Sequence, residues 1–337
     1  MERTSTAMIA QLSVYHMLVD FLCAFSLFHS FTHLPEVFLL YNFCAFALQM
    51  PLGILLDDWM LRRREKTLPG LVFTAAGMIL TAAGSFLSPL VTGTGNAFFH
   101  CGGGVLTIHE DREAELSGRG LGVFVAPGAI GLFLGITFHA TVYYRIIQIL
   151  VCLALVLGCL ALYSSAVPRP VQNVRDNARG VLYTAAVCFT VVVLRSLCGM
   201  AVVFPWKSGF ALSLFSVLCL ACGKAAGGFV CAAQGMKRTV VCTLVPAALC
   251  YALAQNAACG LAALFLFNMT MPLTLYRLAE AMPSQPGFAF GILTFGLFLG
   301  YLPVYYGAVR DIPPFPAGTV ISLVSLVLLY LVVRHDG

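Results

Sequence analysis

The chain has 337 residues, of which 60% are hydrophobic and only 10% are charged, and its formal net charge is +5 at pH 7. Soluble globular proteins carry about 25% charged residues, so the composition excludes that class and indicates a membrane protein with several spans. The positive charge does not indicate a nucleic-acid partner, because most basic residues fall in the loops on one side of the expected spans.

A helix that crosses a lipid bilayer needs about 20 apolar residues. The sequence contains twelve such stretches, so we expect an all-α membrane protein with twelve transmembrane helices. The first stretch is too long for the apolar part of a signal peptide and lacks a small-residue cleavage site, so it should remain in the protein. In chain order the expected spans are residues 8–31, 34–56, 67–87, 89–108, 121–138, 142–163, 181–203, 210–233, 239–256, 258–279, 287–308 and 315–333.

Basic residues set the expected orientation. Most of them lie on one side of the spans, and the positive-inside rule places that side and both termini in the cytoplasm. The longest polar connection, residues 164–180, follows the sixth span. We therefore expect two six-helix bundles, residues 1–163 and 181–337, joined by a cytoplasmic linker in the inner (cytoplasmic) membrane. The basic residues of the expected cytoplasmic side are Arg3, Arg62, Arg63, Arg64, Lys66, Arg112, Arg119, Arg169, Arg175, Arg179, Lys237, Arg238, Arg277 and Arg334.

Two ionisable residues, His16 and Asp20, lie four positions apart in the middle of the first span. Residues at this spacing share one face of a helix. An Asp near the centre of a bilayer costs about 2.5–3.5 kcal/mol on insertion scales, so it is kept where it faces a cavity or a partner. Histidine, with an unperturbed pKa of about 6.5, suits a proton carrier. This face is therefore predicted to belong to a transport pathway.

Four other spans place polar side chains at a similar depth. In the fourth span two of them are again four residues apart and share a face. The set comprises Asn96 and His100 in the fourth span, Arg195 in the seventh, Lys224 in the eighth and Asn268 in the tenth.

Arg195 sets the strongest constraint of this set. A guanidinium stays charged in proteins, so it must meet a carboxylate, a substrate anion or water. We expect an ion pair between Asp20 and Arg195 at rest, and a purely structural lock is the alternative. Lys224 either lines the cavity or extends its ammonium group to the membrane surface.

The two halves share a glycine pattern. Gly-Leu-Phe-Leu-Gly occurs at residues 131–135 in the fifth span and again at 296–300 in the eleventh. Both copies have a further glycine nine residues before the first, Gly122 and Gly287. Two parallel six-helix repeats are typical of transporters whose site lies between the halves near the midplane.

The end of the second span resembles the loop signature of the major facilitator superfamily. Its Gly-x-Leu-x-Asp core and basic end are present, and Met60 replaces the second glycine. The second-half copy has Ala232 at the acidic position. The matching residues are Gly53, Leu55, Asp57 and Arg62 in the first half and Gly228, Gly235, Lys237 and Arg238 in the second.

This resemblance implies a twelve-helix fold whose helices 1, 4, 7 and 10 line a central cavity. It also implies that the loop acts as a charge latch, with Asp57 near the start of helix 11. The alternative is that Asp57 and Arg62 only cap and orient a short loop.

The fifth span resembles the Gly-x-x-x-Gly-Pro-x-x-Gly-Gly signature of exporters in this superfamily. Gly122, Pro127 and Gly131 match, whereas Ala126 and Ile130 replace glycines. Pro127 permits a kink, and small residues let helices pack closely. Close packing alone and a leak-tight seal against helix 8 both explain the pattern. The fourth span, with small residues before Phe99-His100, is similar to that of fosmidomycin-resistance-type exporters.

Together these features predict a secondary active transporter that moves a small organic solute by alternating access. Arg195 and Lys224 favour an anion, and the expected mode is proton-coupled efflux. Uptake and sodium coupling remain open. An intramembrane acyl or phosphate transferase is a weaker alternative, because no nucleophile accompanies the histidines. We expect a monomer with no cofactor, no metal site and no nucleic-acid partner, and the thirteen cysteines should be small buried hydrophobic residues.

Overall fold

The computed structural model describes residues 2–30, 34–170 and 178–334, and nearly all of them are helical. The elements are α1 (Glu2–Ser30), α2 (Pro35–Asn42), the π-helical turn η1 (Phe43–Ala47), α3 (Gln49–Arg63), α4 (Thr67–Leu87), α5 (Pro89–Glu113), α6 (Arg119–Val125), α7 (Pro127–Phe138), α8 (Tyr144–Ser165), α9 (Ala178–Ala201), α10 (Gly209–Gln234), α11 (Met236–Ala252), α12 (Ala257–Asn268), α13 (Thr270–Ala281), α14 (Pro286–Tyr305) and α15 (Pro314–Arg334).

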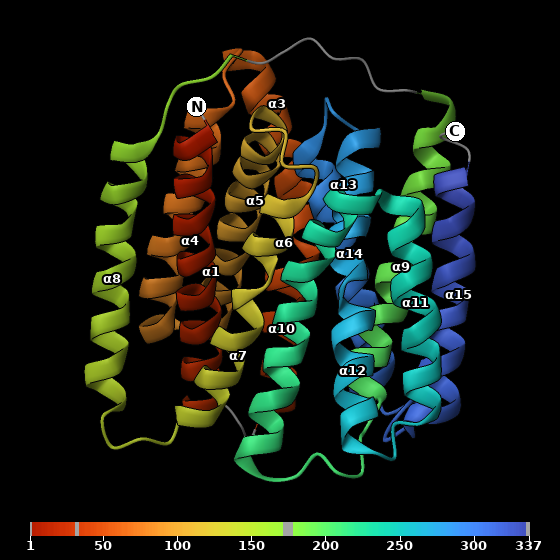
Figure 1. Cartoon of the computed structure of the whole chain (residues 1–337). Helices are drawn as coiled ribbons and strands as arrows, with labels where there is room; N and C mark the ends of the chain where they lie inside the picture. Colours follow the sequence, from red (N-terminus) through yellow and green to blue (C-terminus); the bar gives the residue numbers. More distant parts are fainter. Residues whose placement is uncertain (1, 31–33, 171–177, 335–337) are drawn as a thin grey trace.

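Ten helical stretches of the described chain are long and apolar enough to cross a membrane. Three of the ten are broken helices, formed by α2–η1–α3, α6–α7 and α12–α13. Helices α5 and α11 run beside them (Figure 1) and complete twelve crossing elements in the described residues. Helix α11 has only 17 residues, and α5 ends in a charged segment. The predicted all-α membrane fold is confirmed, and each expected span falls on one of these elements.

The helices form two side-by-side bundles, one built from α1 to α8 and the other from α9 to α15 (Figure 1). Both chain ends lie at the same end of the molecule, which we call the terminal face; the other end is the opposite face. The main contacts between the bundles join α3 to α14 and α6 to α10. Two equivalent pairs of helices thus connect the two halves.

The connection between the bundles is anchored where it leaves α8. Arg169 donates to a carboxylate oxygen of Glu110 at 2.8 Å, and its carbonyl accepts from the backbone N–H of Lys66 at 2.9 Å. The hydroxyl of Thr67 donates to the carbonyl of Val167 at 3.0 Å. Residues 171–177 of the expected linker lie outside the described residues.

The repeated Gly-Leu-Phe-Leu-Gly segment packs in the same way in both bundles. Gly131 and Gly135 of α7 lie against the backbone of α1 at Met17 and Phe21. Their counterparts Gly296 and Gly300 of α14 lie against α9 at Phe189 and Val193. Small residues permit such close approach between membrane helices. The repeat therefore reports an internal symmetry in which the fifth helix of each half packs on the first.

A methyl group should be tolerated differently at the two equivalent positions. At Gly131 it would meet the backbone carbonyl of Met17, whereas at Gly296 it would meet the ring edge of Phe189 at 3.3 Å. Overpacking costs about 1–3 kcal/mol, and replacing a helical glycine by alanine gains up to about 1 kcal/mol. Gly131→Ala should therefore lower the free energy of unfolding in mixed micelles, and Gly296→Ala should leave it nearly unchanged. Equal losses in the two variants would contradict this packing.

Candidate functional site

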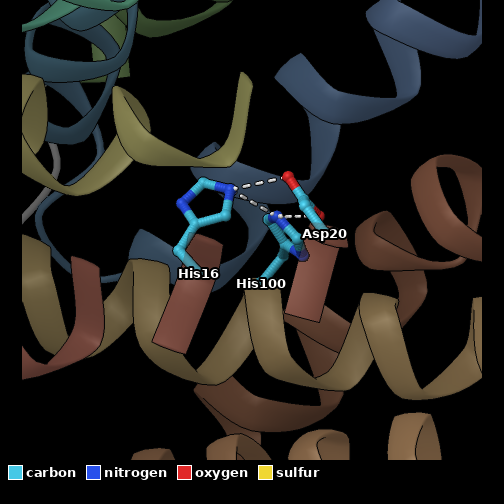
Figure 2. Close-up of side chains that lie close together, drawn as sticks. All are labelled: His16, Asp20 and His100. Carbon is cyan, nitrogen blue, oxygen red and sulfur yellow. Dashed lines mark hydrogen bonds and ion pairs between the residues drawn. The ribbon is translucent and has the colours of Figure 1, made fainter. Parts of the chain in front are cut away.

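Three ionisable side chains meet near the middle of the first bundle. His16 and Asp20 lie in α1, and His100 lies in α5, which crosses beside it. The Nε2 atoms of the two histidines are 2.9 Å apart. The carboxylate of Asp20 lies 3.2 Å from Nε2 of His16 and 3.7 Å from Nε2 of His100. Figure 2 shows the two rings and the carboxylate pointing toward one another.

The other ring nitrogen of each histidine faces a backbone carbonyl. Nδ1 of His16 lies 2.7 Å from the carbonyl oxygen of Phe124, and Nδ1 of His100 lies 2.8 Å from that of Asn96. A carbonyl only accepts, so each Nδ1 must carry a proton and donate it. Neutral rings would then present two Nε2 lone pairs to each other, beside a carboxylate. The 2.9 Å contact is a hydrogen bond only when one ring holds a second proton.

The break in the fifth span creates the acceptor for His16. Helix α6 ends at Val125 and α7 begins at Pro127, which has no backbone N–H. Phe124 is in the last turn of α6, where carbonyls lack intrahelical partners. Its carbonyl is therefore free to accept from His16. Pro127 permits a kink, and the structure shows a helix break here, which has a consequence for the site.

Gly128, the residue after this proline, leaves room for the cluster. A Cβ atom at this position would overlap Nε2 of His16 and would lie 2.5 Å from a carboxylate oxygen of Asp20. Only glycine lets α7 approach α1 at this height. Gly128 is part of the exporter-like segment, but its role could not be predicted from the sequence pattern.

Polar and aromatic neighbours hold the three side chains in place. The side-chain amide of Asn96 donates to the carboxylate of Asp20 at 3.0 Å. Asn96 can reach Asp20 because it lies on the same face of α5 as His100. The rings of Phe99 and Phe124 lie beside His16, with centroids 6.1 and 4.8 Å from its own. Both histidine side chains are buried, whereas that of Asp20 keeps 20% of its surface exposed. Asp20 is therefore the most exposed member of the cluster.

The expected ion pair between Asp20 and Arg195 is not formed, and this prediction is wrong for this conformation. Asp20 instead bonds His16 and Asn96 within its own bundle. Arg195 is buried in α9, and its Nη1 has no hydrogen-bond partner in the described chain. The physical reason is competition, because neighbouring histidines and an amide already satisfy the carboxylate.

The remaining predicted site residues lie in the second bundle. Arg195 and Asp20 both act electrostatically on Lys224, in the middle of α10. Neither Lys224 nor Arg195 makes an ion pair with an acidic residue in the part of the chain that is described. Asn268 ends α12 at the break in the tenth span and donates to the carbonyl of Leu264 at 2.8 Å.

At the terminal face, Asp57 joins the two bundles. Its carboxylate oxygens accept from the backbone N–H groups of Gly287 and Phe288, each at 2.8 Å. These are first-turn donors of α14, which lack intrahelical acceptors and favour a negative charge. Gly53 and Gly287 bring α3 and α14 into backbone contact at this point. The position expected for Asp57, at the start of helix 11, is the position found.

The other expected latch residues contribute differently. Arg62 pairs with Asp58 at 2.8 Å on the surface of its own helix and does not reach the second bundle. The ammonium group of Lys237 lies 5.4 Å from the ring centroid of Tyr330, within the second bundle. Arg238 has no ion pair in the described residues.

The equivalent contact on the other side of the bundle interface has no acid from the opposite half. Gly228 of α10 meets the backbone of Gly118, just before α6. The carboxylate that accepts from the N–H groups of Gly118 and Gly120, at 2.8 and 2.6 Å, comes from Asp111 within the first bundle. Because Asp111 already supplies the carboxylate at this contact, Ala232, the counterpart of Asp57, does not need to be acidic. Nothing in the sequence pattern singles out Asp111.

The predicted close packing of helix 5 on helix 8 is observed. A Cβ atom at Gly122 of α6 would lie 2.8 Å from the carbonyl oxygen of Ala225 and 2.9 Å from that of Lys224, both in α10. Gly131 packs instead on α1. The glycines of the exporter-like segment thus serve two interfaces, one between the bundles and one inside the first bundle.

Removal of the Asp57 carboxylate should loosen the start of α14. Loss of a side-chain cap costs about 1 kcal/mol or more, and each 1.4 kcal/mol is a tenfold change in an opening equilibrium. Asp57→Ala should accelerate amide hydrogen exchange about tenfold in peptides containing Gly287 and Phe288. Asp58→Ala is the matched control, because Asp58 is exposed and pairs with Arg62 of its own helix. Equal exchange in both variants would contradict a latch at Asp57.

No family model matches the sequence, and neither does any curated protein. Two solved structures share the architecture over nearly their whole lengths. A variant of the Escherichia coli fucose:proton symporter FucP is similar with a TM-score of 0.65 and 11% identity, over 99% of this chain and 97% of that chain. The human organic anion transporter MFSD10 (TETRAN) is similar with a TM-score of 0.64 and 15% identity, over 98% of this chain and 99% of that chain. The chain therefore has the fold of major facilitator transporters, as its sequence pattern predicted.

Proposed function

We propose that the protein is a secondary active transporter that exports a small organic anion in exchange for protons, by alternating access. The observation that carries the proposal is the contact between His16 and His100 beside Asp20 in a membrane-spanning bundle. That contact needs an extra proton, and Asp20 stabilises the resulting imidazolium. Loading and release of this proton would couple the proton gradient to the conformational change. One structural neighbour is named a proton symporter, which agrees with this coupling.

The anionic cargo is supported by two unpaired cations. Arg195 is buried without a hydrogen-bond partner for Nη1, and its positive charge interacts electrostatically with that of Lys224. A buried charge is costly unless it is paired, and no acidic side chain in the described residues pairs with either group. A carboxylate, phosphate or sulfonate on the substrate would supply the missing charge. The other structural neighbour is named an organic anion transporter, which agrees with this class.

Alternating access would proceed by rocking of residues 1–163 against 181–337, joined by the segment 164–180. The latch at Asp57 closes the terminal face in this conformation. By the positive-inside rule the basic loops favour the cytoplasm for that face and for both termini. The proposed location is the inner membrane. In this arrangement the cargo would leave by the opposite face, and a single chain would suffice as a monomer.

Export is favoured over uptake by the seal of α6 against α10. The backbones at Gly122 and Gly228 leave no room for side chains between the bundles near the terminal face. The exporter-like segment around Pro127 also shapes the proton site, through Phe124 and Gly128. A transferase is disfavoured, because both structural neighbours are named transporters and each histidine is already held by a carbonyl.

Proton coupling is tested in proteoliposomes. A thermal-shift screen with carboxylates, phosphates, sulfonates, sugars and amines first identifies a ligand, since a bound ligand raises the melting temperature. Radiolabelled flux of that ligand is then measured with and without an imposed pH gradient. Asp20→Asn and His16→Gln should each abolish gradient-driven accumulation while counterflow persists. His139→Gln is the control, because His139 bonds its own helix near the opposite face.

The outcome that contradicts coupling is intact gradient-driven flux in both Asp20→Asn and His16→Gln. Flux that is driven by a sodium gradient and is independent of pH would identify sodium, and not the proton, as the coupling ion. Accumulation driven in the opposite direction under the same gradient would replace export by uptake.

The charge of the cargo is tested at Arg195. Hydrogen bonds to charged groups contribute about 1.5–3 kcal/mol, so Arg195→Gln should weaken binding of an anionic ligand about tenfold or more. Arg145→Gln should not, because Arg145 is exposed on the opposite face and bonds Gln148. Isothermal titration of purified protein measures both. Unchanged affinity in Arg195→Gln would remove Arg195 from the substrate site.

A further inference from the structure

We propose that His16, Asp20 and His100 also form a binding site for a divalent transition-metal ion of the zinc class, which takes the place of the shared proton. Spacing along the chain does not predict a metal site here, because His100 is 84 residues from His16. In the fold these three residues offer one ligand atom each, and the three atoms lie within 4.8 Å of one another. The proposal concerns metal binding and holds whatever the protein transports.

The separations between the ligand atoms suit a single ion. Zinc binds histidine nitrogen at about 2.0–2.1 Å and carboxylate oxygen at about 2.0–2.2 Å. Ligand atoms on one such ion are therefore roughly 2.9 Å apart at right angles and roughly 3.4 Å apart in a tetrahedron. The two Nε2 atoms are 2.9 Å apart, and the two carboxylate oxygens of Asp20 lie 3.2 Å from Nε2 of His16 (Oδ2) and 3.7 Å from Nε2 of His100 (Oδ1). Small side-chain movements would place all three atoms around one ion.

The surroundings of the ligands are those of a metal site. Histidines that bind metals almost always donate their other ring N–H to a carbonyl or carboxylate, which fixes the ring and its tautomer. Here His16 donates to Phe124 and His100 to Asn96, so both Nε2 atoms are left with lone pairs. The amide of Asn96 also holds Asp20. The outer contacts of the site are thus already made in the protein.

The ligand set selects a class of ions. Two imidazoles and one carboxylate suit Zn²⁺, Co²⁺, Mn²⁺ and Fe²⁺, and three protein ligands leave a position open for water or an anion. Asp20, with 20% of its side chain exposed, is the most exposed of the three ligands.

Lys224 allows an independent test of metal binding at this site. Its positive charge acts on both Asp20 and His100, so it opposes a second cation there. Replacement by a neutral side chain of similar length, Lys224→Met, should therefore strengthen metal binding while leaving every ligand in place. Adventitious binding at surface histidines or cysteines would not respond in this way.

The test is titration of the full-length protein in detergent with Co²⁺, after alkylation of accessible thiols, followed by displacement with Zn²⁺. We expect one equivalent of Co²⁺, with the visible absorption of nitrogen and oxygen ligation and no sulfur-to-metal charge-transfer band. His16→Gln, His100→Gln and Asp20→Asn should each lose at least about tenfold in affinity, the loss that even outer contacts produce. Lys224→Met should gain at least about threefold.

His109→Gln is the matched control, because His109 is another buried histidine of α5 and lies outside the cluster. It should bind Co²⁺ as the wild type does. Absence of Co²⁺ absorption in the wild type would overturn the proposal. So would absorption that is unaffected by both His16→Gln and Lys224→Met, which would mark an adventitious site. Because the readout is metal binding without flux, its failure is distinct from failure of the proposed transport.

Discussion

Three hydrogen-bond acceptors converge near the centre of the first bundle: Nε2 of His16, Nε2 of His100 and the carboxylate of Asp20. Because none of them can donate, their convergence requires a cation. The carbonyls of Phe124 and Asn96 hold the Nδ1 protons of His16 and His100, so both Nε2 atoms turn lone pairs toward Asp20. Without an added proton or a metal ion, repulsion would separate them. Much of the local structure serves this arrangement, from the helix break that frees a carbonyl to the glycine that gives it room.

The two halves repeat in packing but differ in charge. Each half places its Gly-Leu-Phe-Leu-Gly segment on its own first helix. The first half carries the acid and the histidines, whereas the second half carries Arg195 and Lys224 without acidic partners in the described residues. The interface is asymmetric too, because Asp57 crosses between the halves on one side and Asp111 stays within its half on the other. A symmetric scaffold thus holds the histidine–carboxylate cluster and the unpaired cations in different bundles, where the relative motion we propose would couple the proposed proton and anion sites.

The helical fold could be predicted from the sequence because apolar stretches of bilayer length leave few alternatives. Helical spacing and the family resemblance allowed four features to be predicted. These are the face shared by His16 and Asp20, the face of Asn96 and His100, the helix break at Pro127 and the place of Asp57. Which faces meet did not follow. The partner of Asp20 was taken to be Arg195 because opposite charges attract, but spacing along one helix says nothing about contacts between helices. The roles of Gly128 and of the Phe124 carbonyl depend on those contacts, and only the assembled structure reveals them.

The shared proton can be observed directly, through the protonation states of His16 and His100. Solid-state ¹⁵N NMR of histidine-labelled protein in lipid, with signals assigned by comparison with His16→Gln and His100→Gln, reports the proton on each ring nitrogen. We expect protonated Nδ1 in both rings and one further proton shared by the two Nε2 atoms in metal-free protein. A ring with a bare Nδ1 and a protonated Nε2 at either position would contradict it.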